Sequence, residues 1–125
     1  MKVFLIIGAI FGFLAVSFGA FGAHLLEGNI DDAKLKTWEK AVNYQMFHTL
    51  PIILAGLLLT KAQLSSLVWA GWLFVLGTVL FSGSLYLYST TGTKFLAMIT
   101  PFGGITFLVA WVFFGYGLTK VLESF

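Results

Sequence analysis

The side chains that could perform chemistry in this chain are a few polar residues set inside long apolar stretches. Gln45 and His48 share a helical face with Trp38, at steps of seven and three residues, and Tyr44 lies beside them. The candidate polar pocket comprises His24, Trp38, Tyr44, Gln45, His48, Ser82, Ser84 and Thr100. Groups of these types could bind a polar ligand, relay a proton or hydrogen-bond helices to one another.

Several interpretations of this polar set remain open. Hydroxyl, amide and imidazole groups cross-link membrane helices through bonds of ~0.6 kcal/mol each, so the simplest is a structural plug. A pocket for a lipid headgroup, a quinone or a small ligand is another, as is a proton path through His24 and His48. A haem on these two histidines lacks a supporting motif. A zinc site lacks the usual ligand spacing. We therefore predict no resident metal and no cofactor.

Catalytic signatures are absent from the sequence. It contains no phosphate-binding loop, no serine nucleophile elbow, no metalloprotease helix motif and no cysteine. No acidic residue lies deep in an apolar stretch, which argues against a proton-coupled transporter. The net charge of +2 is too small, and its lysines too scattered, for a nucleic-acid surface. We therefore predict that the chain is not an enzyme and binds no nucleic acid.

The polar residues are positioned by four apolar stretches at about residues 3–26, 41–60, 66–87 and 95–118. The composition is 59% hydrophobic and 10% charged, and the mean hydropathy is +0.98. Each stretch reaches the ~20 residues with which a helix crosses a bilayer. The first is too long for a signal peptide, so we interpret it as a retained span. Short turns predict an all-α, up-down-up-down four-helix membrane bundle, with residues 1–125 as a single domain.

Residues 31–40 form a distinct segment between the first and second spans. Asp31 and Asp32 suit a helix start, and Leu35, Trp38 and Val42 form an apolar face opposite three lysines. This pattern predicts an amphipathic interfacial helix that runs into the second span. Its role is either to anchor that span or to offer a partner a docking surface.

Small residues recur at helical spacing and are predicted to permit close helix packing. The predicted packing positions are Gly8, Gly12, Ala15, Gly19 and Ala23 in the first span, Gly77 in the third and Gly104 in the fourth. This packing occurs either inside the bundle or at the seam of a homo-oligomer. The second span is poor in small residues, so we expect much of its surface to face lipid or a partner.

The polar residues are predicted to gather in one leaflet, leaving the other leaflet with glycine, alanine, tryptophan and apolar residues. An even number of spans places both termini on one side of the membrane. Lysine counts hardly distinguish the two sides, but charges nearly cancel on the side away from the termini. On that basis we predict cytoplasmic termini.

Four ordered motifs resemble a known family. They are GAFGAH at 19–24, WEKA at 38–41 followed by Tyr44, Gln45 and His48, FSGSLY at 81–86, and TPFGG at 100–104. These motifs resemble the bacterial domain-of-unknown-function-423 family, which is similar to eukaryotic transmembrane-protein-256-like proteins. The resemblance covers nearly the whole chain and implies a small four-span protein of the bacterial cytoplasmic membrane. It implies no activity.

The preferred hypothesis is a structural or interaction protein that assembles with itself or with a larger membrane complex, surrounded by membrane lipids. Its basis is the small-residue stripes, the amphipathic segment and the missing catalytic motifs. The alternative is a binding or transport protein for a ligand, lipid or quinone, which would use the leaflet containing His24 and His48.

Overall fold

The computed structural model describes residues 2–123 as four helical rods. The first rod is α1 (Lys2–Ser17), the π-helical turn η1 (Phe18–Gly22) and α2 (Ala23–Leu26); the second is α3 (Asp32–Leu58); the third is α4 (Ser65–Thr78), the π-helical turn η2 (Val79–Gly83) and α5 (Ser84–Thr91); the fourth is α6 (Lys94–Glu123). All four are long and apolar enough to cross a membrane. The predicted all-α, four-span architecture is confirmed.

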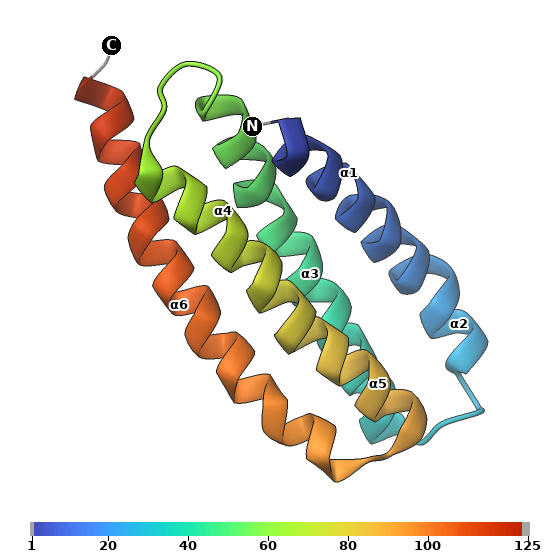
Figure 1. The fold of residues 1–125 in the computed structure, drawn as a ribbon. Coiled ribbons are helices and arrows are strands. Elements are labelled where there is room, and N and C mark those ends of the chain that lie inside the picture. Colours follow the sequence, from blue (N-terminus) through green and yellow to red (C-terminus); the bar gives the residue numbers. More distant parts are fainter. Residues whose placement is uncertain (1, 124–125) are drawn as a thin grey trace.

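The rods alternate in direction, as predicted. The α3–α4 connection lies at the same end of the bundle as the two ends of the chain, and the α2–α3 and α5–α6 connections lie at the other end (Figure 1). α1 packs along α3, and α3 packs against α4 and α5. α4 and α5 in turn pack against α6. α1 and α6 therefore lie on opposite sides of the bundle, and only a small part of α6 reaches α3. This arrangement leaves a groove between α3 and α6.

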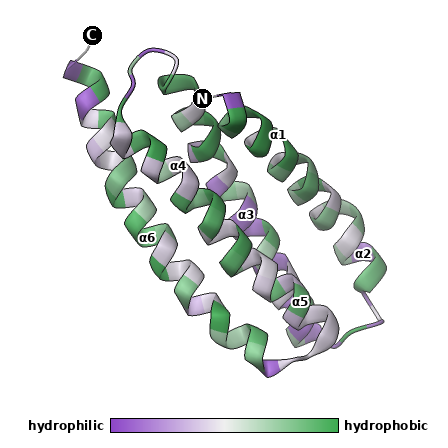
Figure 2. Ribbon diagram, viewed as in Figure 1, coloured by the Kyte–Doolittle hydropathy of each residue, from purple (hydrophilic) through white to green (hydrophobic). Residues whose placement is uncertain are grey.

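α3 is the central helix, which corrects the expectation that much of the surface of the second span faces lipid or a partner. Half of its most apolar stretch is buried, against 17% for the first and fourth rods. It is also the least apolar rod, with a mean hydropathy of 1.2, and hydrophilic positions occur along its ribbon (Figure 2). Larger side chains of α3, such as Val42 and Ile53, occupy the space beside Gly19 and Gly8 of the first rod. α3 therefore needs few small residues of its own at this contact.

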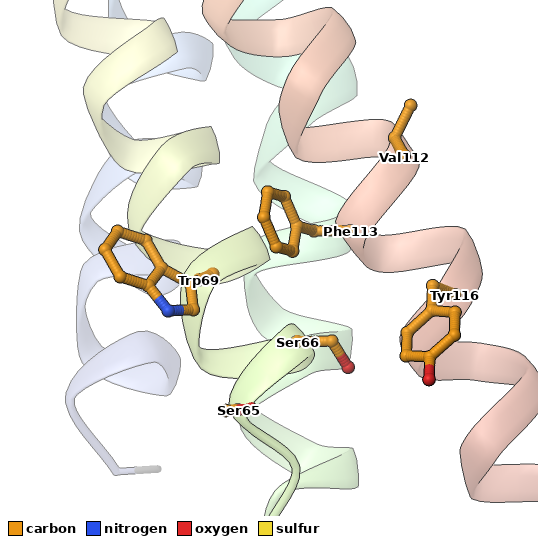
Figure 3. A pocket seen from close by; sticks show the side chains of 6 residues that line it. All are labelled: Ser65, Ser66, Trp69, Val112, Phe113 and Tyr116. Atoms are coloured by element: carbon orange, nitrogen blue, oxygen red, sulfur yellow. The ribbon is translucent and has the colours of Figure 1, made fainter.

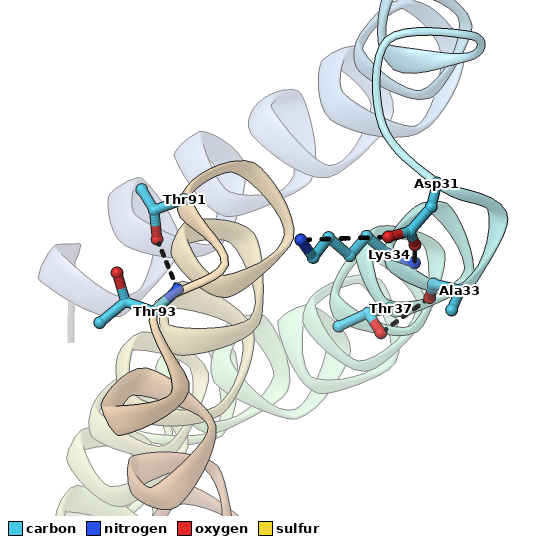
Figure 4. A network of polar contacts seen from close by, with 6 residues as sticks. All are labelled: Asp31, Ala33, Lys34, Thr37, Thr91 and Thr93. Atoms are coloured by element: carbon cyan, nitrogen blue, oxygen red, sulfur yellow. Dashed lines mark hydrogen bonds and ion pairs between the residues drawn. The ribbon is translucent and has the colours of Figure 1, made fainter.

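The amphipathic segment predicted at residues 31–40 is the first part of α3 and continues into the span without a break. Asp31 caps the helix, because its carboxylate accepts a bond of 2.8 Å from the amide of Lys34. The Lys34 ammonium also lies 4.0 Å from that carboxylate. At the α5–α6 turn, the Thr93 amide donates to the hydroxyl of Thr91 (Figure 4). Trp38 turns inward and is buried in the bundle.

The small-residue stripe of α1 faces α3 instead of the outside of the molecule. A Cβ atom added at Gly8 would collide with the side chain of Ile53, and one at Gly19 would lie 3.0 Å from Val42. At Gly12 the nearest atom, in Thr49, would be at an ordinary 3.7 Å. Ala15 on the same stripe is fully buried. Gly8, Ala15 and Gly19 of the stripe are therefore used for packing inside the bundle.

In α6 the closely packed glycine differs from the predicted one. A Cβ at Gly103 would lie 2.5 Å from the backbone nitrogen of Phe81 in η2, whereas one at Gly104 meets no atom within 4 Å. Gly77 does pack closely, because a Cβ there would lie 2.6 Å from the ring of Phe107. Adjacent glycines point about 100° apart on a helix, so only one of the pair can face α5 and η2.

Candidate functional site

The first polar group of the site joins α1, α3 and α5 through Gln45. The amide nitrogen of Gln45 donates to the carbonyl of Phe11 at 2.8 Å, and its oxygen accepts from the Tyr86 hydroxyl at 2.7 Å. Gln45 is buried, so both bonds replace partners that water would otherwise provide. Its position in the middle of α3 allows one side chain to connect three rods.

Trp38 extends this group toward the end of the bundle that carries the α2–α3 and α5–α6 connections. Its indole donates to the carbonyl of Phe18 at 2.9 Å, at the start of η1. The rings of Phe18, Trp38 and Tyr86 are in mutual contact, with centroids 4.7–5.6 Å apart. Gly22 leaves room for the indole, because a Cβ there would lie 2.8 Å from Trp38. The π-helical turn η1 therefore presents the carbonyl and the ring of Phe18 to Trp38 of α3.

His48 belongs to a second group, between α3 and α6. Its Nδ1 lies 2.7 Å from the carbonyl of Tyr44, and its Nε2 accepts from the indole of Trp111 at 3.1 Å. The imidazole stacks on Phe107, with centroids 3.7 Å apart and planes 7° apart. Trp111 and Phe107 lie in the part of the bundle where the sequence offers only glycine, alanine, tryptophan and apolar side chains. The polar groups of α3 therefore extend further along the bundle than expected.

Two serines of the third rod bond to its neighbours. The buried Ser82 hydroxyl donates to the carbonyl of Ala41 at 2.7 Å, which ties η2 to α3. The Ser84 and Thr100 hydroxyls lie 2.6 Å apart and tie α5 to α6. Thr100 precedes Pro101, which has no amide hydrogen to continue the helix bonding pattern.

The predicted pocket residues do not converge on one cavity. His24 is exposed on α2, and the contacts of His48 come from α3, α4 and α6. Tyr44 is 42% exposed and stacks on Phe81 with centroids 4.3 Å apart. Its hydroxyl forms no hydrogen bond among residues 2–123. The remaining pocket residues are divided between the Gln45 group, the His48 group and the two serine bonds.

A hollow of about 480 Å³ lies between α3 and α6 and opens to the outside. Its lining includes Tyr44, His48, Phe81, Pro101, Gly104, Ile105, Phe107, Leu108 and Trp111. We call this hollow the α3/α6 groove. Its size falls within the ~300–1,000 Å³ usual for ligand sites. The open space beside Gly104 is part of it.

Another hollow, of about 440 Å³, lies between α4 and α6 near the chain ends. Trp69 and Phe113 line it with ring planes 28° apart, and Ser66 and Tyr116 also contribute hydroxyls to its lining (Figure 3). Tryptophan and tyrosine are typical of the membrane–water interface. We interpret this hollow as part of the interfacial belt of the bundle.

The sequence-based site lacked two partners that the structure supplies. The Tyr86 hydroxyl donates to the side-chain oxygen of Gln45, and the Trp111 indole donates to Nε2 of His48. Trp111 could have been suspected, since it is a tryptophan near the middle of a span instead of at an interface. Sequence spacing could not show that it faces His48, because they belong to different rods.

Buried polar atoms are fully bonded in the part of the chain that the structure describes. No buried side-chain nitrogen or oxygen there lacks a hydrogen-bond partner. No group of three or more histidine, aspartate or glutamate residues within 2–123 could hold a metal ion. These hydrogen bonds cross-link the rods, either from a side chain to a backbone carbonyl or between two side chains.

Comparison with known proteins identifies the family of this chain. The family described as "Protein of unknown function (DUF423)" matches residues 18–104, which include both π-helical turns and the side chains of Gln45 and His48. The chain belongs to this family. The resemblance seen in the sequence motifs is thereby confirmed. The family is named without an activity, so membership assigns none.

Relatives of similar length are also named as membrane proteins. The chain is 46% identical to the UPF0382 membrane protein YwdK of Bacillus subtilis over 123 residues, which are 98% of this chain and all of that protein. It is 47% identical to the UPF0382 membrane protein SH2409 of Staphylococcus haemolyticus over 112 residues, which are 90% and 91% of the two chains. These names describe membrane proteins. No solved structure matches the chain significantly.

Proposed function

We propose that this DUF423 protein is a non-catalytic membrane protein that acts as one four-span unit and associates through its outer helix faces. The observation that carries the proposal is the bonding inside the bundle. Gln45, His48 and Ser82 each bond a neighbouring rod, and no buried polar side-chain atom among the described residues remains for a reaction. The polar groups therefore stabilise a rigid scaffold, and the surface of that scaffold is what meets other molecules.

The outer face of α6 supports a role in association. Phe102, Ile105 and Val112 are each more than half exposed, and steps of three and seven residues place them on one side of α6. Because α6 packs mainly on the third rod, this side is covered only by lipid or by another membrane protein. The proposed partner is a second copy or a larger complex of the bacterial cytoplasmic membrane.

Photo-crosslinking in native membranes tests this proposal. A photoreactive residue at Val112 on α6 is compared with one at Phe13 on α1, since both side chains are 72% exposed. We expect a discrete protein adduct from at least one face, which mass spectrometry would identify as this chain or as another membrane protein. Lipid adducts alone from both positions, together with a monomer after mild extraction, would overturn the proposal.

We also propose the cytoplasmic membrane as the location, with both chain ends on the cytoplasmic side. The support is the family resemblance to bacterial membrane proteins and the charge distribution. At the end of the bundle that carries the α2–α3 and α5–α6 connections, lysines such as Lys34 are offset by carboxylates such as Asp31.

A further inference from the structure

The α3/α6 groove has features that the scaffold role does not use. Its walls are apolar and aromatic, yet Tyr44 at its rim carries a hydroxyl without a hydrogen-bond partner among the described residues. Tyr44 lies one helical turn beyond Lys40, in the first turn of the predicted membrane-crossing part of α3 (residues 41–60). In helices, long side chains lean toward the N-terminus, which for α3 is this same end. We therefore expect the hydroxyl of Tyr44 to lie toward the membrane surface.

Two lysines flank this end of the groove. Lys40, Tyr44 and His48 follow one another at steps of four and share a side of α3. On α6, Lys94 begins the face that carries Pro101, Ile105 and Leu108 at helical spacing. Both lysines are exposed, and neither forms an ion pair within residues 2–123.

The nearest carboxylate along α3 belongs to the other side of the helix. Glu39 lines a separate recess with Gly19 and Ala23 of the first rod, and no acidic residue lines the α3/α6 groove. Lys40 and Lys94 therefore bring positive charge to this end of the groove, whose lining holds no carboxylate. An anionic group would complement it.

The length of the groove fits one leaflet. Pro101 and Trp111 mark its extent along α6, and ten residues of helix span ~15 Å. Half of a ~30 Å hydrocarbon core is also ~15 Å. Gly104 leaves open space about one turn beyond Pro101, where a larger side chain would occupy the groove.

We propose that the α3/α6 groove binds one anionic phospholipid of the bilayer. Its phosphate lies between Lys40 and Lys94, an ester carbonyl accepts from the Tyr44 hydroxyl, and an acyl chain follows the groove past Gly104. This site does not depend on the proposed association of the protein. The lipid supplies the negative charge that this end of the groove lacks, and its ester carbonyl supplies an acceptor for the Tyr44 hydroxyl.

Native mass spectrometry of the full chain tests the headgroup. The protein is extracted in mild detergent and titrated with palmitoyl-oleoyl phosphatidylglycerol or with phosphatidylcholine of the same chains. One lysine near an anionic lipid is worth about five-fold in affinity, so we expect about 25-fold preference for phosphatidylglycerol. Lys40→Gln and Lys94→Gln should each reduce it about five-fold. Lys2→Gln removes the same charge at the other end of the bundle and should leave it unchanged.

A second pair of variants tests the groove itself. Gly104→Leu places a side chain in the groove and should abolish binding of one phosphatidylglycerol molecule. Gly115→Leu is the matched control, because a Cβ there also meets no atom within 4 Å but the residue does not line the groove. Equal retention of the two lipids by the wild-type protein would overturn the proposal. So would undiminished binding by Gly104→Leu, or a dimer that Gly104→Leu disrupts, since a second copy would then occupy the groove.

Discussion

Trp111 donates its indole N–H to Nε2 of His48 across 3.1 Å, and this bond joins α6 to α3. Nδ1 of the same ring faces the Tyr44 carbonyl at 2.7 Å, so it carries the proton and Nε2 is the acceptor. With both nitrogens bonded and one ring face on Phe107, the imidazole has no free position for a metal or a haem iron. His48 therefore links helices, which is the simplest of the interpretations that the sequence left open.

Trp111→Phe should destabilise the bundle by ~1 kcal/mol. The substitution keeps an aromatic ring beside Phe74 but leaves Nε2 of His48 without its donor. Reversible unfolding in mixed micelles, followed by circular dichroism, would measure the change. Trp69→Phe is the control, since that side chain is 60% exposed and forms no hydrogen bond to His48. Equal effects of the two substitutions would contradict the structural role of the bond.

The adjacent glycines of α6 should respond oppositely to alanine. Gly103→Ala would place a methyl group 2.5 Å from the backbone of Phe81 and force α6 away from η2, at a cost of ~1–3 kcal/mol. Gly104→Ala meets no atom, and because alanine favours helix over glycine, stability should stay equal or rise by up to ~1 kcal/mol. The same unfolding measurement compares them. A larger loss from Gly104→Ala would show that α6 is rotated from the described position.

These glycines also show what the sequence could predict. Span number and direction follow from the length of apolar stretches and the short turns between them, because a bilayer imposes both. Which of Gly103 and Gly104 faces the third rod depends on the rotation of α6, and two adjacent small residues carry no signal for it. The central position of α3 does not follow from its own composition for a similar reason, since the small residues that α3 packs against belong to the first rod.

The predicted pocket illustrates a second limit. Helical spacing predicts that Trp38, Gln45 and His48 share a face of α3, and in the structure Trp38 and Gln45 bond to the first rod whereas His48 bonds to α6. Their partners on other rods depend on axial register, which spacing within one helix does not give. As a result His24 was grouped with His48, whereas it lies exposed on α2 and the bonds of His48 go to Tyr44 and Trp111.

Gln45 and Tyr86 should show a favourable coupling energy of ~0.6–1.7 kcal/mol in a double-mutant cycle. Tyr86→Phe leaves the buried oxygen of Gln45 without its donor, and Gln45→Leu removes the bonds to Tyr86 and to Phe11 together. The cycle isolates the 2.7 Å bond between the two side chains. Tyr88→Phe, combined with Gln45→Leu, is the matched control and should be additive. Additivity in both cycles would mean that Tyr86 contributes through its ring alone.

Cysteine accessibility should place the chain ends in the cytoplasm. The natural sequence has no cysteine, so Gln63→Cys in the α3–α4 connection and Thr93→Cys in the α5–α6 turn each introduce a single thiol at opposite ends of the bundle. With cytoplasmic termini, a membrane-impermeant maleimide applied to intact bacterial cells should label Thr93→Cys and spare Gln63→Cys. A permeant maleimide should label both and so control for reactivity. The reverse pattern would invert the orientation and move the proposed phospholipid site from the outer to the inner leaflet.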